Sequence, residues 1–90
     1  MNKVVVNKLH TLSGHSDCVY ALAAIDSKHF MSSGADGMVV IWDLDNPDEG
    51  RLIAKVPTSI YSLAYDKINH QAVIGQNHEG IHIIDVTAKP

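Results

Sequence analysis

The sequence repeats itself after about 41 residues, and this internal repeat limits the possible folds more than any other feature. The segment VYALA at residues 19–23 returns as IYSLA at residues 60–64. The segment VVIWDL at residues 39–44 returns as IHIIDV at residues 81–86, after one inserted residue. A period of this length is typical of repeat architectures, in which each repeat is one unit that packs against its neighbours.

Each repeat consists of short apolar segments separated by turn residues, which is typical of β-strands. The spacing of apolar residues expected for an amphipathic helix is not sustained anywhere. Asp36-Gly37 marks an expected turn, and residues 46–50 form an expected polar loop. The predicted strands are residues 3–12, 18–25, 29–33, 38–44, 51–56, 60–65, 71–74 and 81–86. The sequence therefore predicts an antiparallel all-β fold.

Residues 18–25 are apolar on both alternating faces of the predicted strand. A sheet with one wet face would alternate apolar and polar residues, so we expect this strand to be covered on both sides. Tyr20 and Tyr61 hold equivalent positions in the two repeats, and both are expected to pack against a neighbouring sheet. Two repeats alone would leave apolar faces and open strand edges in water, which favours association with further units.

Charge and cysteine content exclude several classes of protein. The net charge is −3 and the seven Lys and Arg residues are scattered, which argues against a nucleic-acid surface. The single cysteine, Cys18, allows no internal disulfide and indicates a reducing compartment. The apolar run at residues 4–6 is too short for a signal peptide, and no run reaches the roughly 18 residues of a membrane span. We therefore expect a cytoplasmic protein without nucleic-acid or membrane partners.

Three short motifs resemble the WD40 repeat of β-propeller proteins. They are the Gly-His pair at residues 14–15, the Asp-Gly turn at residues 36–37 and the Trp-Asp pair at residues 42–43. WD40 blades have four strands and about 40 to 45 residues, which fits the observed period. The second repeat is degenerate, because no Gly-His pair precedes Ile60 and Ile84 occupies the tryptophan position.

The resemblance implies an all-β fold of two four-stranded antiparallel propeller blades per chain. Residues 1–50 would hold an N-terminal latch strand and the first repeat, and residues 51–90 the second, degenerate repeat. Propellers have about 4 to 8 blades, so the ring is expected to close by oligomerisation with strand exchange. A homotetramer with eight blades is favoured, and a trimer with six is the alternative. The N-terminal strand of one copy would complete the last blade of the next.

The resemblance also implies a buried hydrogen-bond relay in the first repeat. Its members would be Trp42, Ser32, His15 and Asp36. The physical need is clear, because a buried indole N–H requires an acceptor and a buried imidazole requires partners for both nitrogens. The second repeat lacks these residues and is expected to rely on packing alone.

Catalysis, metal binding and phosphate binding fit the sequence less well than the relay does. Ser32, His15 and Asp36 are the residue types of a catalytic triad, but the serine lies within a predicted strand and not on an exposed elbow. The six histidines lack the spacing of metal ligands, and no glycine-rich phosphate loop occurs. We therefore expect no catalytic residue, no metal and no cofactor.

The expected function is that of a non-enzymatic WD40-like scaffold, a protein-interaction module that self-assembles into a closed ring. Loops on one face of the ring would contact peptides or proteins. The residues expected to face such a partner are Ser16, Asp17, Ala35, Asn77 and His78. The alternative is a designed or truncated two-blade fragment whose only activity is self-assembly. An enzyme that uses the central channel is a third possibility.

Overall fold

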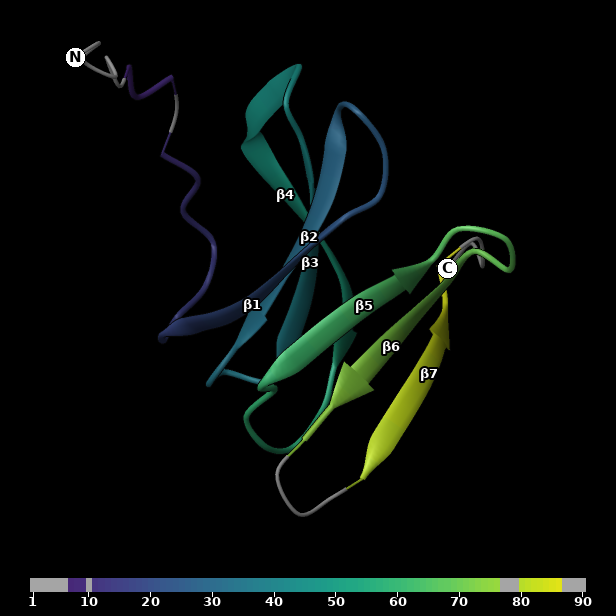
Figure 1. The fold of residues 1–90 in the computed structure, drawn as a ribbon. Helices are drawn as coiled ribbons and strands as arrows, with labels where there is room; N and C mark the ends of the chain where they lie inside the picture. Colours follow the sequence, from purple (N-terminus) through teal and green to yellow (C-terminus); the bar gives the residue numbers. More distant parts are fainter. Residues whose placement is uncertain (1–6, 10, 77–79, 87–90) are drawn as a thin grey trace, which may run out of the picture.

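The computed structural model describes residues 7–9, 11–76 and 80–86, and they form two antiparallel sheets (Figure 1). The first sheet has the strand order β1-β2-β3-β4, and the second sheet has the order β5-β6-β7. The strands are β1 (Val19–Ala24), β2 (His29–Gly34), β3 (Met38–Asp43), β4 (Asn46–Lys55), β5 (Ser62–Asp66), β6 (Gln71–Gly75) and β7 (Ile81–Asp85). Every neighbouring pair is antiparallel, so the predicted all-β class is confirmed.

The N-terminal segment differs from the sequence prediction. Residues 7–9 and 11–12 lie in no strand, so this part of the strand predicted over residues 3–12 is wrong. The remainder of that segment lies outside the described residues. Leu9 is 82% exposed. A strand needs a neighbouring edge for its backbone hydrogen bonds, and the described part of this segment has no such edge beside it.

Strand β4 begins earlier than predicted and includes the expected loop. Residues 46–50 pair with the end of β3, where Asn46 lies opposite Asp43 and Gly50 opposite Trp42. Pro47 cannot donate a backbone hydrogen bond, but β4 is an edge strand, where proline is tolerated. The domain boundary expected at residue 50 falls inside this strand.

The hydrophobic core lies between the two sheets. Met31 and Val39 from the first sheet are fully buried, together with Ala72 and Ile74 from the second sheet and Ile60 from the connection between the sheets. Strand β1 lies beside β5, so the sheets meet along these two strands (Figure 1). On the other face of the first sheet, Trp42 and Val40 are also buried, whereas Leu22 is 66% exposed.

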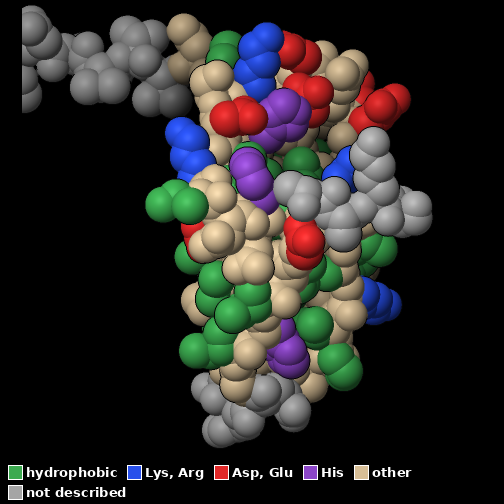
Figure 2. All heavy atoms as spheres, turned by 90° about the vertical axis from the view of Figure 1, so that its right-hand side faces the viewer, with side chains coloured by type: hydrophobic (Ala, Val, Ile, Leu, Met, Phe, Trp, Pro, Cys, Tyr) green, Lys and Arg blue, Asp and Glu red, His purple; other side chains and the backbone are tan. Residues whose placement is uncertain are grey.

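The outer faces of both sheets carry exposed apolar side chains among the described residues. Leu22 on the first sheet is 66% exposed, and Ile81 and Ile83 on the second sheet are 73% and 64% exposed. Figure 2 shows hydrophobic side chains gathered in the lower half of the view, whereas most charged side chains gather at the upper end. The two-sided cover expected for residues 18–25 is therefore incomplete among the described residues, because Leu22 stays largely exposed.

Tyr20 and Tyr61 stack on one another where the two sheets meet. Their ring centroids are 5.2 Å apart and the ring planes differ by 19°. The pair joins equivalent positions of the two repeats across the junction, where such offset stacks stabilise aromatic packing. Each ring is still about half exposed.

Candidate functional site

The first sheet holds a chain of side-chain hydrogen bonds through Trp42, Ser32, His15 and Asp36. The indole Nε1–H of Trp42 donates to Ser32 Oγ at 2.7 Å. Ser32 Oγ lies 2.6 Å from His15 Nε2, and His15 Nδ1 lies 2.9 Å from Asp36 Oδ2. One arrangement satisfies every group: the serine hydroxyl donates to Nε2, and Nδ1–H donates to the carboxylate. The structure thus brings together all four residues selected for the relay.

Local sequence explains why these groups can meet. Trp42 is only 2% exposed, and its ring lies against the backbone of Gly14 and Gly50. A β-carbon on Gly14 would approach the ring to 2.8 Å, which is closer than such atoms come in proteins. The glycine before His15 therefore allows the loop to lie close over the tryptophan, so that the imidazole reaches Ser32.

Asp36 is held by backbone as well as by the imidazole. Its Oδ2 accepts the N–H of Ser16 at 3.0 Å, and its Oδ1 accepts the N–H of Met38 at 3.0 Å. Partial burial would raise the pKa of this carboxyl, but the hydrogen bonds from Met38, His15 and Ser16 outweigh burial and hold the pKa below its usual value. Asp36 therefore fixes the loop at residues 13–17 to the turn between β2 and β3.

The environment of Ser32 favours a structural role for this cluster. The residue is 3% exposed, and its oxygen is already hydrogen-bonded to the indole. A nucleophilic serine needs space for an acyl group and donors aimed at the developing oxyanion. The Ser32 hydroxyl is instead held between the Trp42 indole and the His15 imidazole.

The second sheet contains polar anchoring that the sequence did not reveal. Gln76 Nε2 donates to Thr58 Oγ1 at 2.6 Å and to the Thr58 carbonyl at 3.1 Å. His82 Nε2–H donates to Gln76 Oε1 at 2.7 Å. The prediction that the second repeat relies on packing alone is therefore wrong. Thr58 lies 18 residues before Gln76 and the three residues match no motif, so only the fold brings them together.

Of the residues expected to face a partner, those that the structure describes lie in loops at one end of the first sheet. Ser16 and Asp17 are exposed and Ala35 is half-buried. They are neighbours, because the Ala35 N–H donates to the Cys18 carbonyl at 2.9 Å and the Ser16 N–H reaches Asp36. Asn77 and His78 lie outside the described residues.

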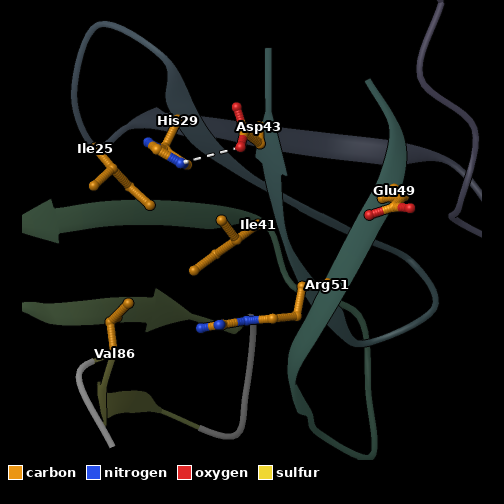
Figure 3. A pocket seen from close by; sticks show the side chains of 7 residues that line it. All are labelled: Ile25, His29, Ile41, Asp43, Glu49, Arg51 and Val86. Carbon is orange, nitrogen blue, oxygen red and sulfur yellow. Dashed lines mark ion pairs between the residues drawn. The ribbon is translucent and has the colours of Figure 1, made fainter. Parts of the chain in front are cut away.

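A hollow of about 360 Å³ opens between the two sheets, away from the relay (Figure 3). It is lined by Ile25, His29, Ile41, Asp43, Glu49, Arg51 and Val86. In Figure 3 the Arg51 side chain extends from β4 toward Val86, while Glu49 lies apart from the other charged groups. The rim carries charges of both signs over an apolar floor, so the hollow does not select one class of ligand by charge.

His29, at the rim of this hollow, lies between two carboxylates. Its Nδ1 is 2.9 Å from Asp26 Oδ1, and its Nε2 is 3.7 Å from Asp43 Oδ2. The hydrogen bond that His29 Nδ1–H donates to Asp26 is the largest cause that raises the pKa of His29 above its ordinary value of 6.5, and the charge of Asp43 adds to it. Asp26 also accepts the backbone N–H groups of Lys28 and His29, an Asx-type turn that the Asp-x-x-His spacing could have indicated.

This geometry predicts a measurable pH effect. An NMR titration of His29 is expected to show a pKa above 6.5, and Asp26→Asn should return it toward that value. Because the folded-state pKa is raised, the stabilisation is complete below the unfolded pKa and disappears as the pH rises through the folded value. Asp45→Asn is the control and should shift the pKa less, since Asp45 pairs with Lys28 at 2.9 Å. An equal shift in both variants would contradict the assignment.

Within residues 7–9, 11–76 and 80–86, no group of three His, Cys, Asp or Glu side chains could hold a metal ion. In that same part of the chain, no helix is long and apolar enough to span a bilayer.

Comparison with known proteins identifies the class to which this fold and relay belong. Residues 6–43 match the family model described as "WD domain, G-beta repeat". The chain thus carries a WD40 repeat, and its two sheets have the fold of β-propeller blades, as the resemblance of the motifs predicted. WD40 domains are typically non-catalytic scaffolds.

Individual proteins show how much of a propeller the chain spans. The WD40 β-propeller domain of Doa1 matches with a TM-score of 0.80 and 25% identity, over 88% of this chain but 27% of that one. The β-propeller domain of Myceliophteria thermophila Cps50 (Swd1) matches with a TM-score of 0.72 and 20% identity, over 86% of this chain and 25% of that one.

A curated relative also matches this chain over only a small part of its own length. The ubiquitin fusion degradation protein 3 homolog of Caenorhabditis elegans is 33% identical over 57 residues, which is 63% of this chain and 6% of that protein. The matched region is therefore a small part of the relative, and about a quarter of each solved propeller.

Proposed function

We propose that this chain is a non-enzymatic, cytoplasmic scaffold that presents the loops of a WD40-type ring to a peptide or another protein. The observation that carries the proposal is that the relay holds a loop in one position. The hydrogen bonds of Asp36 with His15 and with the Ser16 N–H fix the loop that holds Ser16 and Asp17 beside Ala35. A binding surface made of loops needs such preorganisation, because a loop that is already ordered loses less entropy when it binds.

Two exposed aspartates allow a test of this surface. Ubiquitin is the first protein probe, because the Caenorhabditis elegans relative is named for the degradation of ubiquitin fusions. Cytoplasmic proteins captured by the chain and identified by mass spectrometry are the second probe. Asp17→Arg should remove specific binding, whereas Asp45→Arg, at the opposite end of the first sheet, should leave it intact. Binding that both variants retain would place the surface elsewhere, and turnover on a panel of hydrolase substrates would overturn the non-enzymatic role.

We propose further that copies of the chain close the ring. A homotetramer would have eight blades and a trimer six, within the range of about 4 to 8 blades found in propellers. The support is physical: Leu22 on the outer face of the first sheet and Ile81 and Ile83 on that of the second are largely exposed, and no described strand pairs with the outer edge of β7. In such a ring, the N-terminal segment of the next copy, residues 3–12, would become a strand only when it pairs with that edge.

Self-assembly as the sole activity, in a natural fragment or a designed chain, is the alternative. A stable ring without any specific protein partner would favour it over the scaffold. The mass of the chain in solution, measured by light scattering, tests ring closure itself, because a folded monomer of 9.8 kDa would overturn it.

A further inference from the structure

The connection at residues 57–59 lies at the same end of the fold as the turn between β2 and β3 (Figure 1). The hydroxyl of Ser59 donates to the carbonyl of Ala35 on that turn, at 3.2 Å. Thr58 is exposed, whereas Ser59 is half-buried. The connection therefore continues the surface on which the first repeat displays the loop at residues 13–17.

Gln76 holds the place in the second repeat that Ala35 holds in the first, but its backbone is used differently. The N–H of Ala35 donates to the carbonyl of Cys18 at 2.9 Å and so ties the first loop to the β2–β3 turn. The N–H of Gln76 instead donates to the carbonyl of Gly80 at 3.0 Å, within a turn that is one residue longer. The second repeat must therefore hold its loop by another group.

The side-chain amide of Gln76 supplies this group. Its Nε2 donates to Thr58 Oγ1 at 2.6 Å and to the Thr58 carbonyl at 3.1 Å. The same nitrogen lies 3.5 Å from the carbonyl of Ser59, which is the equivalent of Cys18. His82 Nε2–H donates to the amide oxygen at 2.7 Å, so the imidazole orients the amide with its nitrogen toward the connection.

The connection is thus held by both sheets. The N–H of Val56 donates to the carbonyl of Gly37 at 2.8 Å, before the exposed residues. The N–H of Ile60 donates to the carbonyl of Gly34 at 2.9 Å, after them. Both of these hydrogen bonds join the first sheet, whereas the Gln76 amide ties the middle of the connection to the second.

We propose that Gln76 is a positioning residue for a second partner-facing loop, residues 57–59. It does for this loop what Asp36 does for the loop at residues 13–17, and Thr58 contacts the same peptide or protein. This inference rests on the proposed scaffold function and extends the binding surface from one repeat to both. An ordered loop loses less entropy on binding, which is the advantage of holding Thr58 in advance.

Hydrogen exchange of backbone amides tests the positioning. In Gln76→Ala, the amides of Ile60 and Tyr61 should exchange about three- to tenfold faster, because the lost hydrogen bonds no longer oppose local opening. Gln71→Ala, at the other end of β6, is the matched control and should leave these rates unchanged. Unchanged rates in Gln76→Ala overturn the positioning role. An equal rise over the whole second sheet also overturns it, because it shows only a general loss of stability.

Ubiquitin binding tests the surface. Thr58→Arg should weaken binding by about tenfold or more, because a bulky charged side chain clashes with a partner that fits threonine. Ile68→Arg should leave it unchanged, since Ile68 is 89% exposed on the turn between β5 and β6, at the other end of the sheet.

The outcomes separate this inference from the proposed function. Binding that Asp17→Arg removes and Thr58→Arg leaves intact confines the surface to the first repeat and overturns this inference alone. A wild-type chain that binds neither ubiquitin nor a captured protein overturns the proposed function and this surface with it, while the exchange rates still decide whether Gln76 positions the loop.

Discussion

Ser32→Ala is expected to lower the free energy of unfolding by about 2 to 6 kcal/mol, since two buried polar groups lose their partner at once. The indole N–H of Trp42 and Nε2 of His15 both depend on Ser32 Oγ, at 2.7 and 2.6 Å. Each unsatisfied buried group costs about 1 to 3 kcal/mol. Urea unfolding followed by the fluorescence of Trp42, the single tryptophan, measures the loss at a fixed protein concentration.

The adjacent serine provides the control for this experiment. Ser33 is as buried as Ser32, at 0% against 3% exposure, but it points to the other face of β2. Among the described residues, its hydroxyl has no hydrogen-bond partner. Ser33→Ala should therefore leave stability unchanged or raise it by about 1 kcal/mol, because an unpaired buried hydroxyl is itself unfavourable. Equal losses in both variants would show that burial, and not the relay, governs this strand.

Gly34→Ala is expected to destabilise the first sheet by about 3 kcal/mol or more, the upper end of the usual cost of overpacking. A β-carbon at this position would overlap the carbonyl oxygen of Cys18 and would also contact the backbone of Val19. That carbonyl accepts the N–H of Ala35, so it cannot move without loss of a backbone hydrogen bond. Thermal unfolding measured by circular dichroism should show a clearly lower midpoint.

The repeat again offers a matched control, because Gly75 holds the same place in the second sheet. There the added β-carbon would overlap the hydroxyl of Ser62, a side chain that can rotate away. Gly75→Ala should therefore lower the midpoint much less than Gly34→Ala does. A larger loss at Gly75 would contradict the steric account.

Most of the architecture could be predicted from the sequence, because it depends on local patterns. Alternation of apolar residues and the glycine-containing turns place β1, β2, β3, β6 and β7 within a residue or two of the predicted segments. The relay residues could be selected because a buried indole and a buried imidazole restrict which side chains may lie beside them. The WD40 resemblance is confirmed on the same residues.

The missed features depend on contacts between distant segments. Residues 46–50 pair with the edge of β3. Their polar composition resembles that of a loop, so the sequence does not indicate this pairing. The contacts of Gln76 with Thr58 and His82 join a strand end, a connection and a neighbouring strand. No spacing rule predicts such contacts, because each of these residue types is equally common on open surfaces.

The anchoring of Gln76 on Thr58 has a consequence for how the chain is made. Thr58 lies in the connection that leaves the first sheet, whereas Gln76 and His82 belong to the last third of the sequence. During synthesis from the N-terminus, the acceptor is therefore in place before the final hairpin emerges from the ribosome. The contacts that anchor Gln76 can therefore form only after the whole second sheet has been made.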